Sequence, residues 1–116
     1  MPTVVLSVNV PSDKVLDLRV AQRLSAIASY RTGKPEQYVM SHVLSEQTMT
    51  FGGTDEPAGF ARFVSIGALK PETNASIAAD VAELLSSSYG IEASRTYIEF
   101  VDVKERWMFG WNGGTF

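Results

Sequence analysis

The sequence predicts an α/β fold in which two βαβ units form one four-stranded sheet with both helices on one face. Segments with strand and helix periodicity occur in the order strand–helix–strand, a loop, and strand–helix–strand again. The two halves are nearly equal in length, and each helix ends at a glycine before a strand that begins near a tyrosine. Because βαβ units pair their strands in parallel, two such units are expected to join into one sheet.

The first half begins with a strand predicted at Thr3–Val10, where apolar residues alternate along one face. Ser12 is the expected N-cap of a helix that runs from about Asp13 to Arg31. Gly33 is expected to cap the end of this helix before a second strand at Tyr38–Leu44. The buried stripe of the helix consists of residues at helical spacing: Leu16, Val20, Leu24, Ile27 and Ala28.

The second half repeats this order with a strand predicted at Gly59–Ile66. A helix with proline in its first turn is expected from about Lys70 to Tyr89, with Gly90 as its cap. A fourth strand is expected at about Thr96–Val101, and Thr48–Phe51 could add a short one. The buried stripe of the second helix consists of Ile77, Val81, Leu84, Leu85 and Ser88.

Composition and charge exclude several classes of function. A chain of 116 residues can build one hydrophobic core, so residues 1–116 are expected to form a single domain. The formal net charge of -3, with both signs spread along the chain, does not fit a nucleic-acid-binding face. There is no cysteine, which excludes disulfides and thiolate chemistry. His42 is the only histidine, and no metal site is expected.

The sequence contains no segment that predicts membrane insertion or export through a leader. No apolar run approaches the roughly 18 residues that a membrane span needs. The first residues lack the basic segment and small-residue cleavage site of a signal peptide. A cytoplasmic location without a membrane partner is therefore expected, with secretion by a leaderless route as the alternative.

The predicted helices cover only one face of the sheet, yet the other face carries Val5, Val64 and Tyr97. A sheet that is apolar on both faces needs a second layer. The tail from Trp107 to Phe116 is aromatic, whereas a flexible terminus is usually polar. A partner subunit is the simplest source of the missing layer, so an oligomer is predicted.

The first strand is preceded by Met1-Pro2. Removal of Met1 would leave the nitrogen of Pro2 as a free secondary amine. A terminal amine has a reference pKa of about 7.7–8.0, and burial or a nearby cation lowers it. Such an amine can act as a general base near neutral pH. A structural explanation also exists, because proline is well tolerated at the first residue of a strand.

Several short segments occur along the chain in a specific order. They are Met1-Pro2, Thr32-Gly33-Lys34-Pro35 before Tyr38-Val39-Met40, Phe51-Gly52-Gly53-Thr54, Val64-Ser65-Ile66-Gly67 and Gly110-Trp111-Asn112-Gly113-Gly114-Thr115-Phe116. Together they resemble the macrophage migration inhibitory factor family, within the tautomerase superfamily. The resemblance covers essentially the whole chain, and its loop and central segments are most similar to the plant and protist branches.

The resemblance implies an α+β arrangement, with a four-stranded mixed sheet backed by two antiparallel helices. Three such subunits would pack as a homotrimer with active sites at the subunit interfaces. The implied activity is keto–enol tautomerisation of phenylpyruvate-like or dopachrome-like substrates, which are small aromatic keto or enol acids. No metal and no organic cofactor would be required.

The resemblance also assigns roles to individual residues. Pro2 would be the general base, and Lys34 would hold a substrate carboxylate and disfavour protonated Pro2. The backbone N–H of Ile66, with Ser65 beside it, would donate to the same anionic end. Tyr97 would reach in from the adjacent subunit. The aromatic rim would consist of Tyr38, Phe109, Trp111 and Phe116. Apolar walls strengthen such charge interactions because they exclude water.

The chain departs from the family pattern at several positions. Glu99 stands where an asparagine commonly faces the pocket, and its carboxylate would repel acidic or phenolate groups, which predicts weaker turnover of hydroxyphenylpyruvate. Phe109 is bulkier than the valine often found there and should narrow the pocket mouth. Ala58 and Ala61 replace the Cys-x-x-Cys pair of the vertebrate cytokine, so thiol–oxidoreductase activity is not expected.

Two function classes remain open at this point. The first is an enzyme that uses the N-terminal proline. The second is a signalling or binding protein that keeps the trimer while its tautomerase activity is weak or vestigial. The arginine linked to chemokine-receptor mimicry in the vertebrate protein is replaced around Ser12. This replacement argues against cytokine activity on animal receptors, without excluding a receptor partner.

Overall fold

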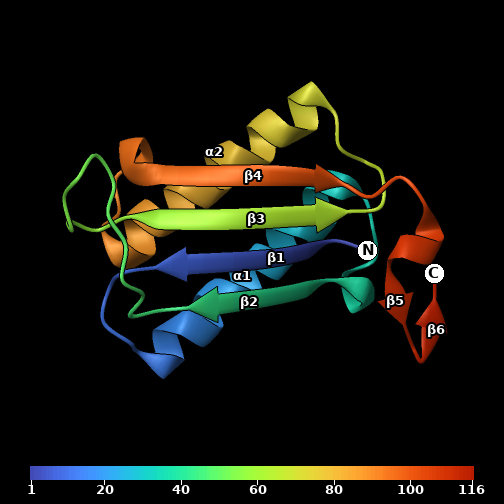
Figure 1. Cartoon of the computed structure of the whole chain (residues 1–116), viewed down its shortest axis with the longest axis horizontal. Helices are drawn as coiled ribbons and strands as arrows, with labels where there is room; N and C mark the ends of the chain where they lie inside the picture. The colour runs from blue at the N-terminus through green and yellow to red at the C-terminus, as the bar shows by residue number, and fades with distance from the viewer.

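Four strands form one sheet in the spatial order β2-β1-β3-β4 in the computed structural model, which describes all 116 residues. The strands are β1 (Thr3–Val8), β2 (Met40–Leu44), β3 (Gly59–Ser65) and β4 (Thr96–Asp102). β1 and β2 are parallel, as are β3 and β4, while β1 and β3 are antiparallel (Figure 1). The two βαβ units and the mixed four-stranded sheet are therefore confirmed.

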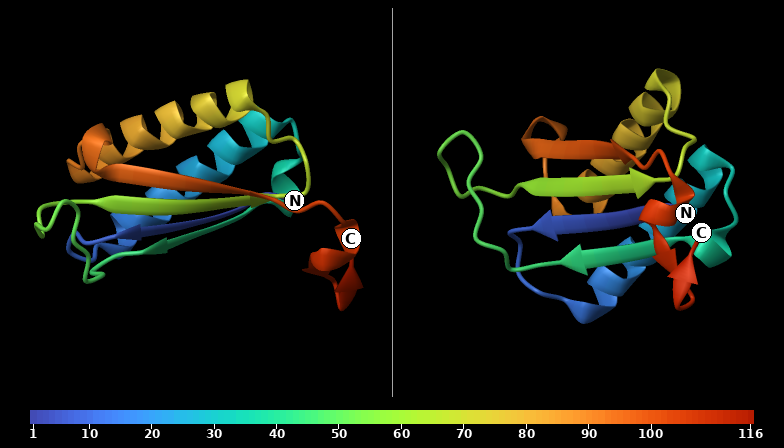
Figure 2. Two further views of the ribbon diagram at one scale, coloured as in Figure 1. Left: turned by 45° about the horizontal axis from the view of Figure 1, so that its top comes forward. Right: turned by 45° about the vertical axis from the view of Figure 1, so that its right-hand side comes forward.

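The helices α1 (Lys14–Thr32) and α2 (Pro71–Tyr89) both cover the same face of this sheet (Figure 2). The core lies between the two layers. Most residues of the predicted stripes enter it, while Leu16 and Ile27 pack against its edge and Ser88 is not part of it. The core consists of Val4, Leu6, Val8, Val20, Leu24, Ala28, Ala61, Phe63, Ile77, Val81, Leu84, Leu85 and Ile91. Each fully buried aliphatic side chain contributes about 1.5–3 kcal/mol relative to an exposed one. Neither helix is long and apolar enough to cross a membrane.

Local hydrogen bonds move several element boundaries away from their predicted positions. The carboxylate of Asp13, not the hydroxyl of Ser12, caps α1, because it accepts the backbone N–H three residues ahead at 3.1 Å. The second strand begins at Met40 and not at Tyr38, because Glu36–Tyr38 form a 3-10 turn after the proline. Backbone pairing of β2 therefore starts later along the chain than the apolar pattern suggested.

Short elements occupy the segments between and after the main strands. The predicted extra strand at Thr48–Phe51 is reduced to one isolated bridge between Phe51 and Thr54. The tail forms a small hairpin that the sequence did not predict (Figure 1). The short elements are η1 (Glu36–Tyr38), η2 (Ala93–Arg95), η3 (Arg106–Met108), β5 (Gly110–Trp111) and β6 (Gly114–Thr115).

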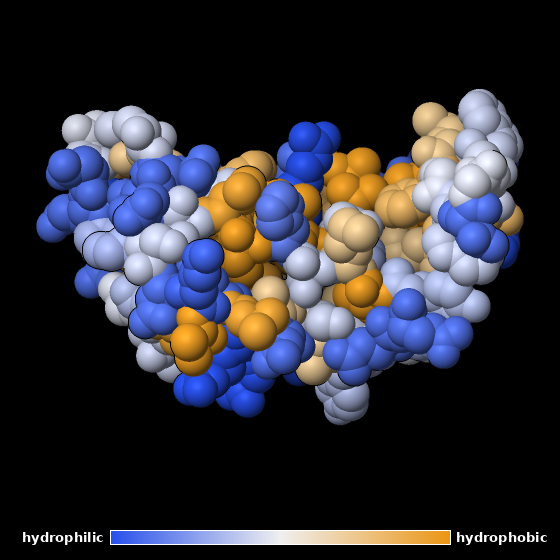
Figure 3. All heavy atoms as spheres, turned by 90° about the horizontal axis from the view of Figure 1, so that it is seen from below, coloured by the Kyte–Doolittle hydropathy of each residue, from blue (hydrophilic) through white to orange (hydrophobic).

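The sheet face opposite the helices has no second layer in the single chain. The register aligns its side chains in three cross-strand rows, Met40–Thr3–Val64–Val101, His42–Val5–Arg62–Glu99 and Leu44–Ser7–Phe60–Tyr97. Met40, Phe60 and Tyr97 are large apolar residues that remain exposed. Figure 3 views the molecule from below, edge-on to the sheet, and shows apolar atoms mainly in the middle with more hydrophilic atoms toward both ends. Val5, Val64 and Tyr97 lie on this face, as predicted.

Candidate functional site

The chain's amino terminus lies at the end of the sheet where the tail hairpin folds back (Figure 1). Pro2 is fully buried there, and its backbone oxygen accepts the N–H of Met40 at 3.1 Å. The Met1 amine lies near the side chain of Lys34. Burial, then Lys34, then Arg106 lower the pKa of this amine from 8.0 to about 6. An amine at this position is therefore largely neutral, and basic, at neutral pH.

Lys34 is held in place by the end of helix α1. Gly33 adopts a left-handed conformation that ends the helix, which suits a residue without a Cβ. The backbone of Lys34 is fixed on both sides, since its oxygen accepts the Ser29 hydroxyl at 2.7 Å and its N–H donates to Thr32 at 3.3 Å. Its ammonium group takes part in no ion pair of the chain. The charge of Lys34 is therefore available to an anionic ligand.

Ser65 and Ile66 lie at the end of β3, at the same end of the sheet as the amino terminus. Ser65 is fully buried, and its hydroxyl donates to the backbone oxygen of Gly67 at 2.8 Å, so this side chain shapes the turn. Its own backbone oxygen accepts the N–H of Val103 at 2.8 Å. The N–H of Ile66 has no hydrogen-bond partner within the chain. It can therefore donate to a bound ligand.

The four predicted rim aromatics are brought together around Phe116. Its ring stacks on Trp111 with centroids 5.1 Å apart, and Phe109 lies 5.9 Å away. Tyr38 presents its ring edge-on to Trp111 at 5.7 Å and to Phe116 at 6.2 Å. The backbone N–H of Phe116 also donates to the oxygen of Phe109 at 3.1 Å. The unpredicted hairpin is thus what assembles these rings.

Tyr97 and Glu99 do not join the other predicted site residues within one chain. The register places Tyr97 beside Phe60 in the row of Ser7, at the opposite end of β1 from Pro2. Tyr97 packs against Phe51 at 4.9 Å and borders a hollow of about 490 Å³. Glu99 lies 3.5 Å from Arg62 in the middle of the open face. That Tyr97 completes a site in an adjacent subunit stays a prediction.

Arg106 is a site residue that sequence reasoning missed. It acts on the charge of the Met1 amine, and its Nε donates to the backbone oxygen of Phe116 at 3.1 Å. A signal was present in the sequence, because two basic residues, Lys104 and Arg106, directly precede the aromatic tail. The prediction for the tail considered its aromatic residues alone. Arg106 and Lys34 are far apart in the sequence, so the sequence did not indicate that both lie near the same amine.

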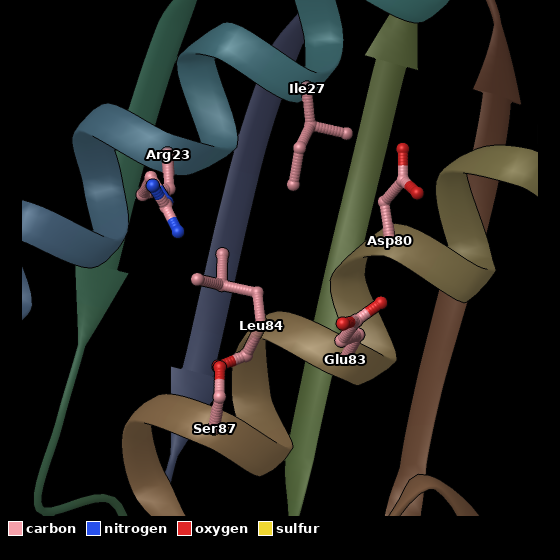
Figure 4. Close-up of a pocket in the computed structure, with 6 residues that line it drawn as sticks. All are labelled: Arg23, Ile27, Asp80, Glu83, Leu84 and Ser87. Atoms are coloured by element: carbon pink, nitrogen blue, oxygen red, sulfur yellow. The ribbon is translucent and has the colours of Figure 1, made fainter.

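A second hollow lies on the helical side of the molecule, between α1 and α2 (Figure 4). It measures about 240 Å³ and is lined by Arg23, Ile27, Asp80, Glu83, Leu84 and Ser87. Asp80 is already bound by Arg31, with Nε 2.7 Å from the carboxylate. No group of three or more histidine or acidic side chains in the chain could hold a metal ion.

The mixed four-stranded sheet of two βαβ units, with both helices on one face, is the fold of the tautomerase superfamily. The sequence model described as "Macrophage migration inhibitory factor (MIF)" matches residues 1–116. The chain belongs to this family, which confirms the resemblance drawn from its ordered segments.

Individual relatives and solved structures agree with this assignment. A macrophage migration inhibitory factor homolog of Trichuris trichiura is 40% identical over 116 residues, which cover 100% of both chains. The Mus musculus macrophage migration inhibitory factor is 34% identical over 100% of this chain and 99% of its own. The crystal structure of a homologue from Prochlorococcus marinus has a TM-score of 0.92 at 34% identity and covers 98% of each chain.

Proposed function

We propose that this protein is a tautomerase that interconverts the keto and enol forms of small aromatic keto acids such as phenylpyruvate. Pro2 is the general base once Met1 has been removed. The observation that carries the proposal is the arrangement at the start of β1, where buried Pro2 follows a Met1 amine whose pKa is lowered from 8.0 to about 6 by burial, Lys34 and Arg106. After processing, the Pro2 nitrogen becomes the terminal amine one residue further along the chain, and we expect the same two cations to lower its pKa.

The reaction moves one proton from carbon to oxygen and involves no oxidation or reduction of the substrate. The neutral Pro2 nitrogen takes a proton from the carbon next to the carbonyl, and the electron pair of that C–H bond forms the enol double bond. Negative charge develops on the carbonyl oxygen, which is then protonated, and the amine returns to its neutral form. Lys34 and the free N–H of Ile66 are suited to hold anionic oxygens at this end. The aromatic rings reduce access of water.

The active unit is proposed to be a homotrimer in which each site lies between two copies. The uncovered sheet face supports this, since Met40, Phe60 and Tyr97 leave large apolar surface exposed in one chain. The separation of Tyr97 and Glu99 from Pro2 also supports it, because only a second copy can bring them to the amine. Sedimentation velocity tests the assembly, and a monomer at assay concentration would contradict it.

The catalytic proposal is tested by measuring phenylpyruvate tautomerisation for protein whose intact mass shows that Met1 is absent. Pro2→Ala is expected to lower kcat by about 10²–10⁴, the usual contribution of a positioned general base. Insertion of one alanine between Met1 and Pro2 keeps the proline nitrogen an amide and is expected to abolish activity without unfolding the protein. Rates equal to the unmodified chain in both variants would show that Pro2 is not the base and would favour the binding-protein alternative.

A further inference from the structure

We propose that Arg106 is a second anion-binding residue of the site, which acts with Lys34 on the acidic head of the substrate. It makes the site selective for aromatic carboxylates over their uncharged analogues. The inference rests on the proposed function for its catalytic readout, while its binding readout is independent of turnover.

The first argument is the position of Arg106 relative to the aromatic rings. It is the first residue of η3, between the end of β4 and the tail hairpin. Its Nε donates to the backbone oxygen of Phe116 at 3.1 Å, and the ring of that residue stacks on Trp111. The guanidinium is therefore tied to the backbone of the residue at the centre of the aromatic cluster. A ring bound against this cluster would carry its acidic group close to Arg106.

The second argument is that no acidic side chain pairs with either cation, and the only oxygen that Arg106 contacts is the main-chain oxygen of the last residue, Phe116. The three ion pairs of the protein join Arg31 to Asp80, Arg62 to Glu99 and Lys104 to Asp102. The acids nearest in sequence, Glu36 and Glu105, are exposed and form no ion pair with Lys34 or Arg106. Only the Nε of Arg106 is used in a hydrogen bond, so its remaining N–H groups are free to donate. An arginine fork of this kind matches a carboxylate in geometry as well as charge.

The third argument is electrostatic. Lys34 and Arg106 act with the same sign on one amine, and no carboxylate among the groups that act on it opposes them. Lys34 is partly buried and Arg106 is exposed, and both positive charges attract an anion bound between them. The same field stabilises the negative charge that develops on the substrate oxygen. The chemical class that satisfies both cations is an aromatic ring with an acidic head.

Arg106 also anchors the tail, so the test must separate charge from anchoring. Arg106→Gln removes the charge and keeps a side chain that can donate to the oxygen of Phe116. Arg106→Lys keeps the charge and loses the planar fork. Lys104→Gln is the matched control, because it removes the same charge two residues away, from a side chain that pairs with Asp102 in solvent. Far-UV and near-UV circular dichroism of each variant checks that the tail keeps its packing.

The binding experiment uses 3-phenylpropanoate, which cannot enolise in the assay, and its uncharged amide. Arg106→Gln is expected to weaken calorimetric binding of the carboxylate by about tenfold, the range for a charge-assisted hydrogen bond. Binding of the amide is expected to change less than twofold, as is carboxylate binding by Lys104→Gln. An equal loss for carboxylate and amide, or no loss for either, would overturn the proposal.

The kinetic experiment compares phenylpyruvate with its methyl ester across pH. Arg106→Gln is expected to lower kcat/KM for the acid about tenfold and for the ester much less, and to move the rise of kcat/KM with pH to higher pH, with partial recovery in Arg106→Lys. If Pro2→Ala matches the unmodified chain in rate, the proposed function fails, and the binding experiment still decides on Arg106. If Pro2→Ala is inactive while Arg106→Gln treats acid and ester alike, only the role of Arg106 fails.

Discussion

The guanidinium of Arg95 lies over the ring of Phe51, 5.3 Å from its centroid, and donates to the backbone oxygen of the same residue at 3.0 Å. It also donates to three further backbone oxygens of one loop, those of Thr54, Glu56 and Pro57, at 2.9–3.4 Å. One side chain thus closes the whole loop between β2 and β3. Because Phe51 packs on Tyr97, Arg95 also fixes one wall of the hollow at that end of the sheet.

Replacing Arg95 by alanine is therefore expected to destabilise the protein by about 1–3 kcal/mol, since several backbone oxygens lose their donor together. Hydrogen exchange should increase in the loop from Phe51 to Pro57 and remain unchanged in the helices. Arg19→Ala is a suitable control, because this exposed arginine of α1 makes no ion pair and no side-chain hydrogen bond. Similar hydrogen exchange in the loop of both variants would show that Arg95 does not hold this loop in place.

A second polar contact joins the two helices to each other and to the segment that follows β2. The hydroxyl of Tyr89 donates to the Asp17 carboxylate at 2.5 Å, and Ser45 donates to its other oxygen at 2.9 Å. Burial, followed by the hydrogen bond to Asp17 and the charge of that carboxylate, raises the pKa of the Tyr89 hydroxyl well above its ordinary value. The folded state therefore favours the protonated phenol.

The sign of the resulting pH dependence follows from this raised pKa. Below the ordinary tyrosine pKa of about 10 the phenol is protonated in both states, and the contact contributes fully. Above it the unfolded chain loses a proton that the folded chain retains, so the contribution falls as pH rises. Tyr89→Phe is expected to cost about 1–2 kcal/mol in urea unfolding at pH 7 and to flatten the alkaline loss of stability. Tyr30→Phe, at a largely exposed tyrosine, should do neither.

The apolar periodicity of the sequence was sufficient to predict the fold. Alternation in β1 and the helical stripes through Leu24 and Val81 specify which faces are buried, and burial dominates the free energy of such elements. The tail was different, because the hairpin at Gly110–Thr115 is held by short backbone pairs and ring contacts and has no periodic pattern. Lys104 and Arg106 before the tail indicated basic charge there, but the approach of Arg106 to the amine depends on the hairpin, so its position could not be predicted.

Glu99 illustrates a prediction that the structure refines. The sequence suggested an isolated carboxylate that disfavours hydroxyphenylpyruvate, but Arg62 lies 3.5 Å from it, and both side chains are about half exposed. The pair carries little net charge, so Arg62 partly offsets the repulsion that Glu99 exerts on an acidic or phenolate group of the substrate. Arg62→Gln is expected to lower kcat/KM for hydroxyphenylpyruvate about two- to fivefold, because the carboxylate is then unpaired. Glu99→Asn should raise it by a similar factor.

The ratio of rates on hydroxyphenylpyruvate and phenylpyruvate is the measurement that decides this point. Asp102→Asn serves as the control, since it removes a carboxylate from the same strand that pairs with Lys104 instead. Kinetics that do not change in Glu99→Asn would remove Glu99 from the substrate site and leave the Arg62 pair as a feature of the open face alone.

The last prediction concerns the pH dependence of catalysis, which links the amine to its two cations. A base must be neutral to accept a proton, so kcat/KM is expected to rise with pH through the pKa of the free Pro2 amine. Burial and the charges of Lys34 and Arg106 lower the pKa of the Met1 amine from 8.0 to about 6, and the same effects are expected to lower the pKa of the Pro2 amine. Activity should therefore already be near its plateau at pH 7.5. Lys34→Gln removes the larger of the two charge effects, so the amine pKa rises and the ascending limb moves to higher pH. The same variant should raise KM, because it also loses the carboxylate contact. A pH profile of kcat/KM that keeps its position in Lys34→Gln would mean that the titrating group is not the amine beside Lys34.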